Sequence, residues 1–249
     1  MVELSYKTKG KYDMMSKYKQ VYEDIKKQIE EGKLQANQEL PTENELMEVY
    51  GYSKDTIRKA LSLLELDGYI QKMRGRNSIV MEHGRTKNNY LSEIKTSDEL
   101  NRDEHLDITT QLDNLYIIQG EQEIMDIFKV EDSVDFYRVG RSRIIAGEKI
   151  EFELSYFDRR VVPYLNKEIA EKSIYQYLEN QLGLKITHSR REISFRYATQ
   201  EEKDNMDLGK FNMVAVVTSL TYLSNGQLFQ YGTISYRPDK FTFVTMAKR

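Results

Sequence analysis

The sequence has no cysteine, no tryptophan, 3 prolines and 3 histidines among its 249 residues. Without cysteine, the chain can form no disulfide bond and do no thiol chemistry. His83, His105 and His188 are scattered and show no metal-ligand spacing, so we expect neither a metal site nor a cofactor. No apolar run approaches membrane-spanning length, and residues 1–11 lack the apolar core of a signal peptide. These absences favour a cytoplasmic protein.

The charge balance is close to neutral. Charged residues make up 31% of the chain, hydrophobic residues 39%, and the formal net charge is −3. This balance argues against non-specific coating of nucleic acid but leaves room for a local basic patch. Between Gln71 and Arg85, four basic residues accompany a single acidic one. This segment could be a solvated hairpin or a contact surface for DNA.

Two short helices joined by a tight turn are expected at residues 43–50 and 54–67, and the first is expected to bury Leu46, Val49 and Tyr50. A capping box, a helix-ending glycine and a second cap support them, at Thr42 with Glu45, Gly51 and Ser53. An apolar stripe at helical spacing predicts an earlier helix at 17–31. The segment 69–80 follows the helices and is expected to form a hairpin with a basic tip. Helix, turn, helix and basic hairpin is the plan of a winged helix-turn-helix, which enters the major groove of DNA.

The segment from Tyr18 to Val80 resembles the DNA-binding domain of GntR-type bacterial transcription regulators. The matching residues occur in order and at the right spacing: Leu40-Pro41-Thr42-Glu43, Glu45-Leu46, Gly51, Ser53, Thr56-Ile57-Arg58-Lys59-Ala60-Leu61, Leu64, Asp67-Gly68 and Arg74-Gly75-Arg76. The resemblance, with the basic hairpin tip, implies DNA contacts at Asn44, Ser53, Lys54, Asp55, Thr56, Arg58, Arg74, Gly75 and Arg76.

At three of these positions, the residue type affects how the bases of DNA could be read. Asn44 and Lys54 stand where members of the family often carry arginine, which alters guanine readout. Asp55 could accept a hydrogen bond from a cytosine amino group, or it could pair with Lys59 one turn later.

The segment 136–156 predicts an antiparallel hairpin, because apolar and polar residues alternate on both sides of Ala146-Gly147-Glu148. A three-residue connection would place Ile144 opposite Ile150. The same register pairs Arg143 with Glu151 and Arg141 with Glu153, whereas a two-residue turn would scramble the two faces. These pairs could be ordinary cross-strand salt bridges or an anion site in which two guanidiniums hold a phosphate. The pattern alone does not separate the two.

Further elements are expected in the second half. Helices are predicted at 171–182, with Ser173 at or near the N-cap, and at 199–208, with a capping box of Thr199 and Glu202. Strands are predicted at 193–197, 214–223 and 228–236. The last two are expected to pair through a two-residue Asn225-Gly226 turn, with Thr221 opposite Gln230 and Leu223 opposite Leu228.

The second half resembles the effector-binding (UTRA) domain of the HutC-type branch of the GntR family, which has a chorismate lyase-like fold. The match is carried by Arg141-x-Arg143, Gly147-Glu148, Glu153 and the closing Tyr236-Arg237-Pro238-Asp239-Lys240-Phe241. In members that respond to sugar phosphates, the phosphate contacts would fall on Arg141, Arg143, Ser173, Thr96 and Ser97. The sugar contacts would fall on Glu153, Gln230 and Tyr236. The ending and the wing also resemble trehalose operon repressors, whose inducer is trehalose 6-phosphate.

We therefore expect an α+β chain with four parts. These are an N-terminal extension (1–15, disordered), a winged helix-turn-helix (16–82), a linker (83–92) and an effector-binding and dimerisation domain with a mainly antiparallel sheet (93–249). The expected protein is a homodimeric repressor that binds a palindromic operator in duplex DNA and is released by a sugar phosphate. The alternatives are a regulator that senses an amino-sugar 6-phosphate, a lyase-like enzyme and a protein-interaction module.

Overall fold

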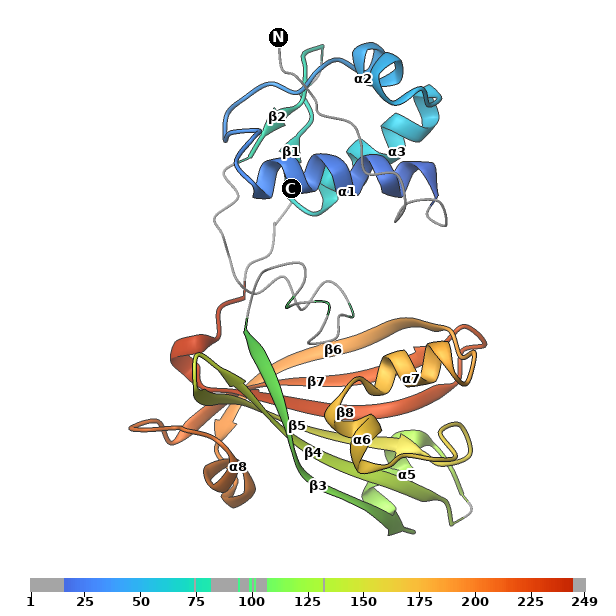
Figure 1. Cartoon of the computed structure of the whole chain (residues 1–249), viewed down its shortest axis with the longest axis vertical. Coiled ribbons are helices and arrows are strands. Elements are labelled where there is room, and N and C mark those ends of the chain that lie inside the picture. Colours follow the sequence, from blue (N-terminus) through green and yellow to red (C-terminus); the bar gives the residue numbers. More distant parts are fainter. Residues whose placement is uncertain are drawn as a thin grey trace. The chain divides into compact units, whose positions relative to one another are not determined.

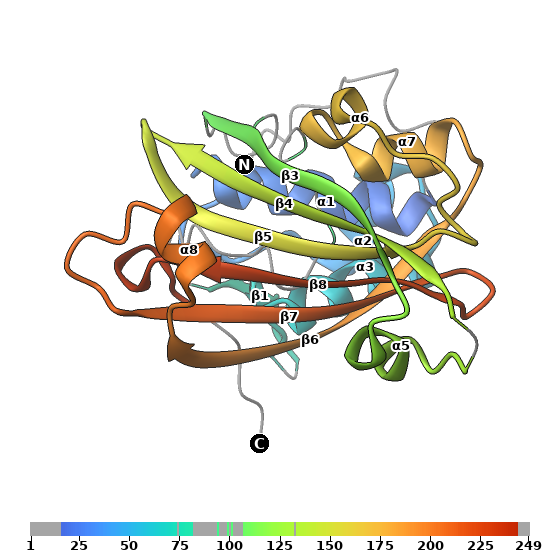
Figure 2. The ribbon, with the colours of Figure 1, turned by 90° about the horizontal axis from the view of Figure 1, so that it is seen from below.

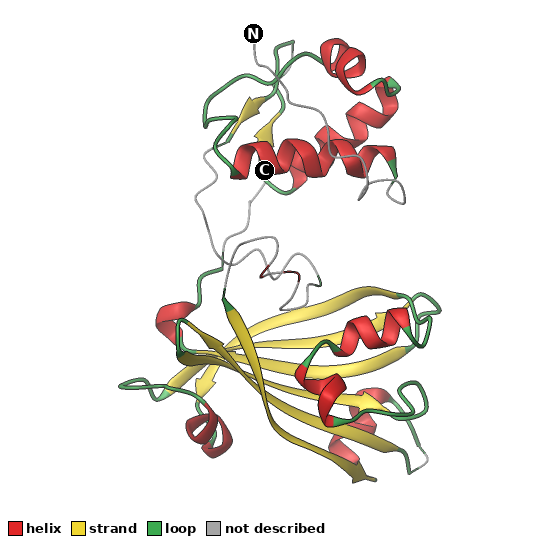
Figure 3. Ribbon diagram, viewed as in Figure 1, coloured by secondary structure: helices red, strands yellow, loops and turns green. Residues whose placement is uncertain are grey.

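The computed structural model describes residues 16–73, 75–81, 94, 99, 101, 107–131 and 133–243. Contacts divide the chain into two compact units, one of residues 1–87 with 243–249 and the other of residues 88–242. The first is mainly helical and the second is built on a large sheet (Figure 3). None of the described helices combines the length and apolar character needed to cross a membrane.

In its described part, the first unit contains three helices and a small hairpin (Figure 1). Its elements are α1 (Lys17–Glu30), α2 (Glu43–Tyr50), α3 (Lys54–Leu66), β1 (Ile70–Gln71) and β2 (Ile79–Val80). The core forms because the apolar stripes of the helices meet under the hairpin. Its fully buried members include Val21, Ile25, Leu46, Ile57, Leu64, Tyr69 and Val80. The predicted helix-turn-helix and wing are therefore present.

Local signals set the ends of α2. The Thr42 hydroxyl accepts a hydrogen bond from the Glu45 amide at 3.2 Å, and the Glu45 carboxylate accepts one from the Thr42 amide at 2.7 Å. Gly51 ends the helix with a φ of 65°, a conformation that costs least for a residue without Cβ. The predicted capping box and helix bounds are thus confirmed.

Two details of this unit differ from the sequence prediction. Val49 was expected in the core but is 40% exposed, whereas Leu46 is buried and Met47 and Tyr50 pack partly buried against the core. Ser53 stands at the N-cap of α3, yet its hydroxyl bonds to the Thr56 hydroxyl at 3.0 Å instead of capping a backbone amide.

The second unit is a six-stranded antiparallel sheet in the order β3-β4-β5-β8-β7-β6, and Figure 2 shows the strands side by side in this order. The strands are β3 (Ile108–Gln119), β4 (Asp135–Ile145), β5 (Glu148–Asp158), β6 (Ile186–Tyr197), β7 (Met213–Leu223) and β8 (Leu228–Tyr236). The expected mainly antiparallel sheet is confirmed, although β3 was not anticipated and β6 is longer than predicted.

Helices cover both faces of the sheet. On one face, α6 (Lys167–Glu171) and α7 (Ile174–Asn180) pack over Tyr137, Val139 and Phe157. On the other face, α5 (Gln122–Phe128) packs on Phe136, and α8 (Gln200–Asn205) lies beside a cluster around Phe152. Consecutive strand residues point to opposite faces, so the face under α6 and α7 also carries Arg141 and Arg143. The helix predicted at 171–182 is shorter than expected, and α5 was not predicted.

The β4–β5 hairpin contains the predicted Arg–Glu pairs, but its turn differs from the predicted one. Arg141 pairs with Glu153 and Arg143 with Glu151, as the alternation predicted. The predicted pairing of Ile144 with Ile150 is wrong, because Ile144 pairs with Lys149. The turn has two residues, Ala146 and Gly147, both with positive φ, and a bulge after Arg143 restores the parity.

The β7–β8 hairpin shows a similar correction. Thr221 pairs with Gln230 as predicted. Leu228, however, pairs with Tyr222 instead of Leu223, because the register shifts by one residue next to Thr221. The connection is accordingly longer than the two-residue turn that Asn225-Gly226 suggested.

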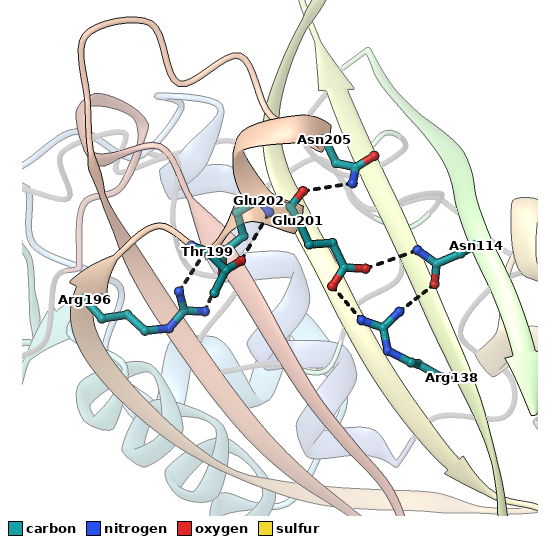
Figure 4. Close-up of polar contacts among 8 residues, drawn as sticks. Asn114, Arg138, Arg196, Thr199, Glu201, Glu202 and Asn205 are labelled. Carbon is teal, nitrogen blue, oxygen red and sulfur yellow. Dashed lines mark hydrogen bonds and ion pairs between the residues drawn. The ribbon is translucent and has the colours of Figure 1, made fainter. Parts of the chain in front are cut away.

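Two adjacent glutamates fasten α8 to the sheet, as Figure 4 shows. Glu201 accepts from Arg138 at 2.5 Å and from Asn114 at 3.2 Å, which links α8 to β4 and β3. Glu202 pairs with Arg196 of β6 at 2.7 Å and closes the predicted capping box with Thr199. The helix is thus bonded to β3 and β4 near one edge of the sheet and to β6 at the other edge.

Candidate functional site

The second unit contains a cavity on the sheet face that carries the two arginines. Strands β4 to β8 form its floor, and the start of α7 lies against it. Its lining residues are Ile94, Arg141, Arg143, Glu153, Ser155, Lys172, Ser173, Ile174, Tyr175, Ser189, Arg191, Ser219, Thr221, Gln230, Gly232 and Ile234. Among these, four are basic, only Glu153 is acidic, and several carry hydroxyl or amide groups.

The centre of the cavity is a carboxylate shared by two guanidiniums. Arg141 Nη2 donates to Glu153 Oε1 at 2.6 Å, and Arg143 Nη2 donates to Glu153 Oε2 at 2.6 Å. The pairing follows from strand register, because Arg141 stands opposite Glu153 and Arg143 is the next residue on the same face. Arg143 Nε also lies 3.6 Å from Glu151 Oε2.

The surroundings move the pKa values of the two glutamates in opposite directions. Burial alone would raise the pKa of Glu153, but the guanidiniums of Arg141 and Arg143 outweigh burial and lower it to about 2. Burial raises the pKa of Glu151 to about 7, because the single guanidinium of Arg143 offsets only part of the desolvation. Burial would lower the pKa of Arg143, but the charges of both glutamates outweigh it and raise the value.

A chain of hydrogen bonds leads from α7 to the central carboxylate. The Tyr175 hydroxyl donates to Gln230 Oε1, and Gln230 Nε2 donates to the Ser155 hydroxyl at 3.0 Å. Ser155 in turn donates to Glu153 Oε1 at 2.9 Å. Burial raises the pKa of Tyr175 to about 12, so its phenol remains a donor at neutral pH.

The cavity brings together five of the predicted effector residues: Arg141, Arg143, Glu153, Ser173 and Gln230. Ser173 caps α7 and accepts from the Gln176 amide at 3.3 Å. Tyr236 lies on the same sheet face, opposite Glu151, but outside the cavity lining. Thr96 and Ser97 lie outside the described residues.

Several lining residues were not identified from the sequence. The alternation of β5 could have identified Ser155, which lies two residues after Glu153 on the same face. Arg191 and Ser189 escaped notice because the start of β6 is polar on both faces and no strand was expected there. No sequence pattern pointed to Tyr175, since its contact with Gln230 depends on how α7 crosses the sheet.

The first unit presents the predicted DNA-contacting residues at its surface. Asn44, Ser53, Lys54, Asp55 and Arg58 are exposed, and Thr56 is partly buried. Gly75 and Arg76 of the wing are also exposed, whereas Arg74 lies outside the described residues.

The recognition helix α3 is tied to α2 through one acidic residue. Arg58 Nε lies 3.0 Å from Glu43 Oε2, and Lys54 Nζ lies 3.9 Å from the same oxygen. Both cations are about half exposed, so the ion pairs with Glu43 leave them open to solvent. Lys59 places its ammonium 3.9 Å from the Tyr18 ring centre, which argues against the expected Asp55–Lys59 pair.

Comparisons with known proteins match a family model to each of the two units. The family model "Bacterial regulatory proteins, gntR family" matches residues 17–80, and the UTRA domain model matches residues 103–242. The HTH-type transcriptional regulator TreR of Bacillus subtilis (strain 168) is 37% identical over 94% of this chain and 98% of its own length. The HTH-type transcriptional repressor NagR of the same organism is 27% identical over 91% of this chain and 93% of its own length.

Solved structures extend the similarity to the fold. The possible transcriptional regulator YydK from B. subtilis has a TM-score of 0.75 and 32% identity, covering 94% of this chain and all of that one. The effector binding domain of the B. subtilis trehalose repressor TreR has a TM-score of 0.51 and 35% identity, covering 57% of this chain and 98% of that one.

The relatives are named transcriptional regulators, and this sets aside the alternative of a lyase-like enzyme. With a helix-turn-helix of the gntR type in front of a UTRA domain, the chain belongs to the GntR family of bacterial transcription regulators, in its HutC branch.

Proposed function

We propose that this protein is a homodimeric repressor of a sugar-utilisation operon, whose grip on palindromic operator DNA is relieved by a sugar phosphate. Trehalose 6-phosphate is the effector that we favour. The observation that carries the proposal is the convergence of Arg141, Arg143 and Arg191 on one cavity that also offers polar side chains.

The charge of the cavity supports an anionic ligand. Its described lining contains four basic side chains against one carboxylate, and both Arg141 and Arg143 are largely buried. Guanidiniums are well suited to phosphate because their planar forks donate two parallel hydrogen bonds. Ser173 would add a hydroxyl group to the phosphate contacts. The dipole of α7 would contribute little, because the helix is only seven residues long.

The remaining polar groups suit a sugar. Glu153 and Gln230 supply acceptors, while Ser189 and Thr221, joined at 3.2 Å, lie on neighbouring strands of the floor. Trehalose is favoured because TreR, whose effector domain is described as that of a trehalose repressor, is similar over nearly the whole chain.

Two features support the proposed dimer: the exposed apolar residues on an edge strand, and the two half-sites of a palindromic operator. Strand β6 is an edge strand that exposes Phe195 at 64% and Tyr197 at 72%, next to Met213 of β7, which is 39% exposed. Exposed apolar side chains on an edge strand favour contact with another chain. Two copies would place two recognition helices on half-sites about one helical turn, roughly 34 Å, apart.

A thermal-shift screen of the full chain tests the effector. We expect trehalose 6-phosphate to raise the melting temperature, and trehalose without its phosphate to have a much smaller effect. Equal shifts with and without the phosphate would contradict the anion site.

Glu153 favours a second candidate. A buried carboxylate in the cavity could also pair with a protonated amine, so an amino-sugar 6-phosphate would fit the same arginines. Titration with glucosamine 6-phosphate beside trehalose 6-phosphate separates the two, because the effector should bind at least tenfold more tightly than the other compound.

A further inference from the structure

The place best suited to a bound phosphate is already filled by a side chain. The Glu153 carboxylate spans the two guanidiniums, with one oxygen at 2.6 Å from Arg141 Nη2 and the other at 2.6 Å from Arg143 Nη2. A phosphate held by the same two arginines would need these same donors.

We propose that Glu153 acts as an internal competitor, whose carboxylate must leave the two arginines before an anionic ligand can bind. This inference rests on the proposed anion site and adds how that site selects its ligand. A ligand gains full affinity only if it brings an anion for the arginines and hydrogen-bond donors for the displaced carboxylate.

The fit of Glu153 to the arginines is incomplete. Arg141 is only 8% exposed, and its Nε–H has no hydrogen-bond partner among the described residues. Its Nη1 is bonded to the backbone carbonyl of Ala170 at 3.2 Å. The two carboxylate oxygens of Glu153 are already shared between Arg141, Arg143 and Ser155, whereas a phosphate has additional oxygens that could reach such a donor. A phosphate ligand could therefore bond to the Arg141 Nε–H, which the Glu153 carboxylate leaves without a hydrogen bond among the described residues.

Release of Glu153 has a cost that depends on the incoming ligand. Inorganic phosphate would replace the carboxylate at the arginines but leave a buried, charged Glu153 with few donors, which is strongly unfavourable. A sugar phosphate brings hydroxyl groups that can donate to the freed carboxylate. Glu153 would thus discriminate against inorganic phosphate, which is abundant in cells, without excluding the phosphate group itself.

A hydrogen-bond chain holds the competitor in place. Tyr175 donates to Gln230, Gln230 donates to Ser155, and Ser155 donates to Glu153, with each hydrogen bond pointing towards the carboxylate. Ser155 is fully buried and Gln230 nearly so, so water competes little for these bonds. Because Tyr175 belongs to α7, displacement of Glu153 would also change the contacts of that helix.

Calorimetric titration of the full chain with inorganic phosphate tests the proposal. The variant E153Q keeps the shape of the side chain but removes the charge that competes. We expect E153Q to bind inorganic phosphate at least tenfold more tightly than the wild-type protein. The control E192Q removes an exposed charge on β6 and should leave phosphate affinity unchanged.

A second variant covers the case in which E153Q does not fold. S155A removes one hydrogen bond that holds Glu153 and should raise phosphate affinity by several-fold. Phosphate affinity that is unchanged or weaker in the folded variants would overturn the proposal.

Titration with trehalose 6-phosphate separates this inference from the proposed effector. The ratio of sugar-phosphate to inorganic-phosphate affinity should fall at least tenfold in E153Q. If no sugar phosphate binds the wild-type protein but E153Q still gains affinity for inorganic phosphate, the proposed effector is wrong and the competitor role of Glu153 stands.

Discussion

Arg143 divides its guanidinium unequally between two glutamates, with Nη2 at 2.6 Å from Glu153 and Nε at 3.6 Å from Glu151. The closer carboxylate also binds Arg141, so it stays ionised. Glu151 faces Arg143, Glu153 and the buried phenol of Tyr236, and burial raises its pKa to about 7. Glu151 and Glu153 therefore make the stability of the fold depend on pH in opposite directions.

The first prediction follows from Glu151. Its pKa is higher in the folded chain than the ordinary value of 4.5, so the folded state binds more protons, and stability falls as the pH rises from about 4.5 through about 7. A shift of this size corresponds to at most about 3 kcal/mol. Urea denaturation at pH 5.5 and pH 8 should show a smaller pH dependence for E151Q than for the wild-type protein. An equal dependence in both would show that Glu151 does not titrate in this range.

The second prediction concerns the arginines of the cavity. R143A should weaken the binding of trehalose 6-phosphate by about 10- to 100-fold, the usual effect of losing a charged hydrogen bond. Operator affinity without the effector should be unchanged. The matched control R190A removes an exposed arginine of β6. Calorimetry that finds equal effector affinity in R143A and R190A would remove Arg143 from the site.

The third prediction concerns the sheet face shown in Figure 4. A Cβ added at Gly140 would lie 2.5 Å from Asn114 Nδ2, and Asn114 is held by Arg138 at 2.9 Å and by Glu201 at 3.2 Å. G140A should therefore destabilise the chain by about 1–3 kcal/mol. Adding N114A should recover part of that loss in a thermal melt. No recovery would show that the strain lies elsewhere.

The fourth prediction concerns the recognition helix. R58A should weaken operator binding and lower the slope of log affinity against log salt by about one unit, because one phosphate contact is lost. K27A, on the exposed side of α1, is the control. A salt titration with the same slope in R58A and the wild-type protein would exclude a phosphate contact by Arg58.

Residue alternation was enough to predict the pairing of Arg141 with Glu153. Side chains on a strand change face at every residue, so parity determines which residues can be partners. The bulge at Ile150 was not predictable, because it compensates for a two-residue turn, which residue alternation alone disfavours. The capping boxes at Thr42 and Thr199 were predictable, since each depends on only two nearby residues.

The rest of the cavity depends on contacts between distant segments. Tyr175 and Gln230 are 55 residues apart and meet only because α7 crosses the sheet. Arg191 joins the cavity through the β6–β7–β8 pairing, whose outer strand lacks a clear apolar pattern. Val49 was misjudged because helical spacing indicates a possible core face without showing what covers it.

We propose that a phosphorylated sugar bound in the second unit controls how tightly the first unit binds DNA. The most direct test is fluorescence anisotropy of a labelled fragment from upstream of the protein's own operon, titrated with trehalose 6-phosphate. Effector and DNA binding should oppose each other by about 1–3 kcal/mol, or 5- to 150-fold in affinity, in the wild-type protein and not in R143A. Anisotropy that stays constant in the wild-type protein at saturating trehalose 6-phosphate, or that falls equally in R143A, would show that the sugar phosphate does not control DNA binding through Arg143.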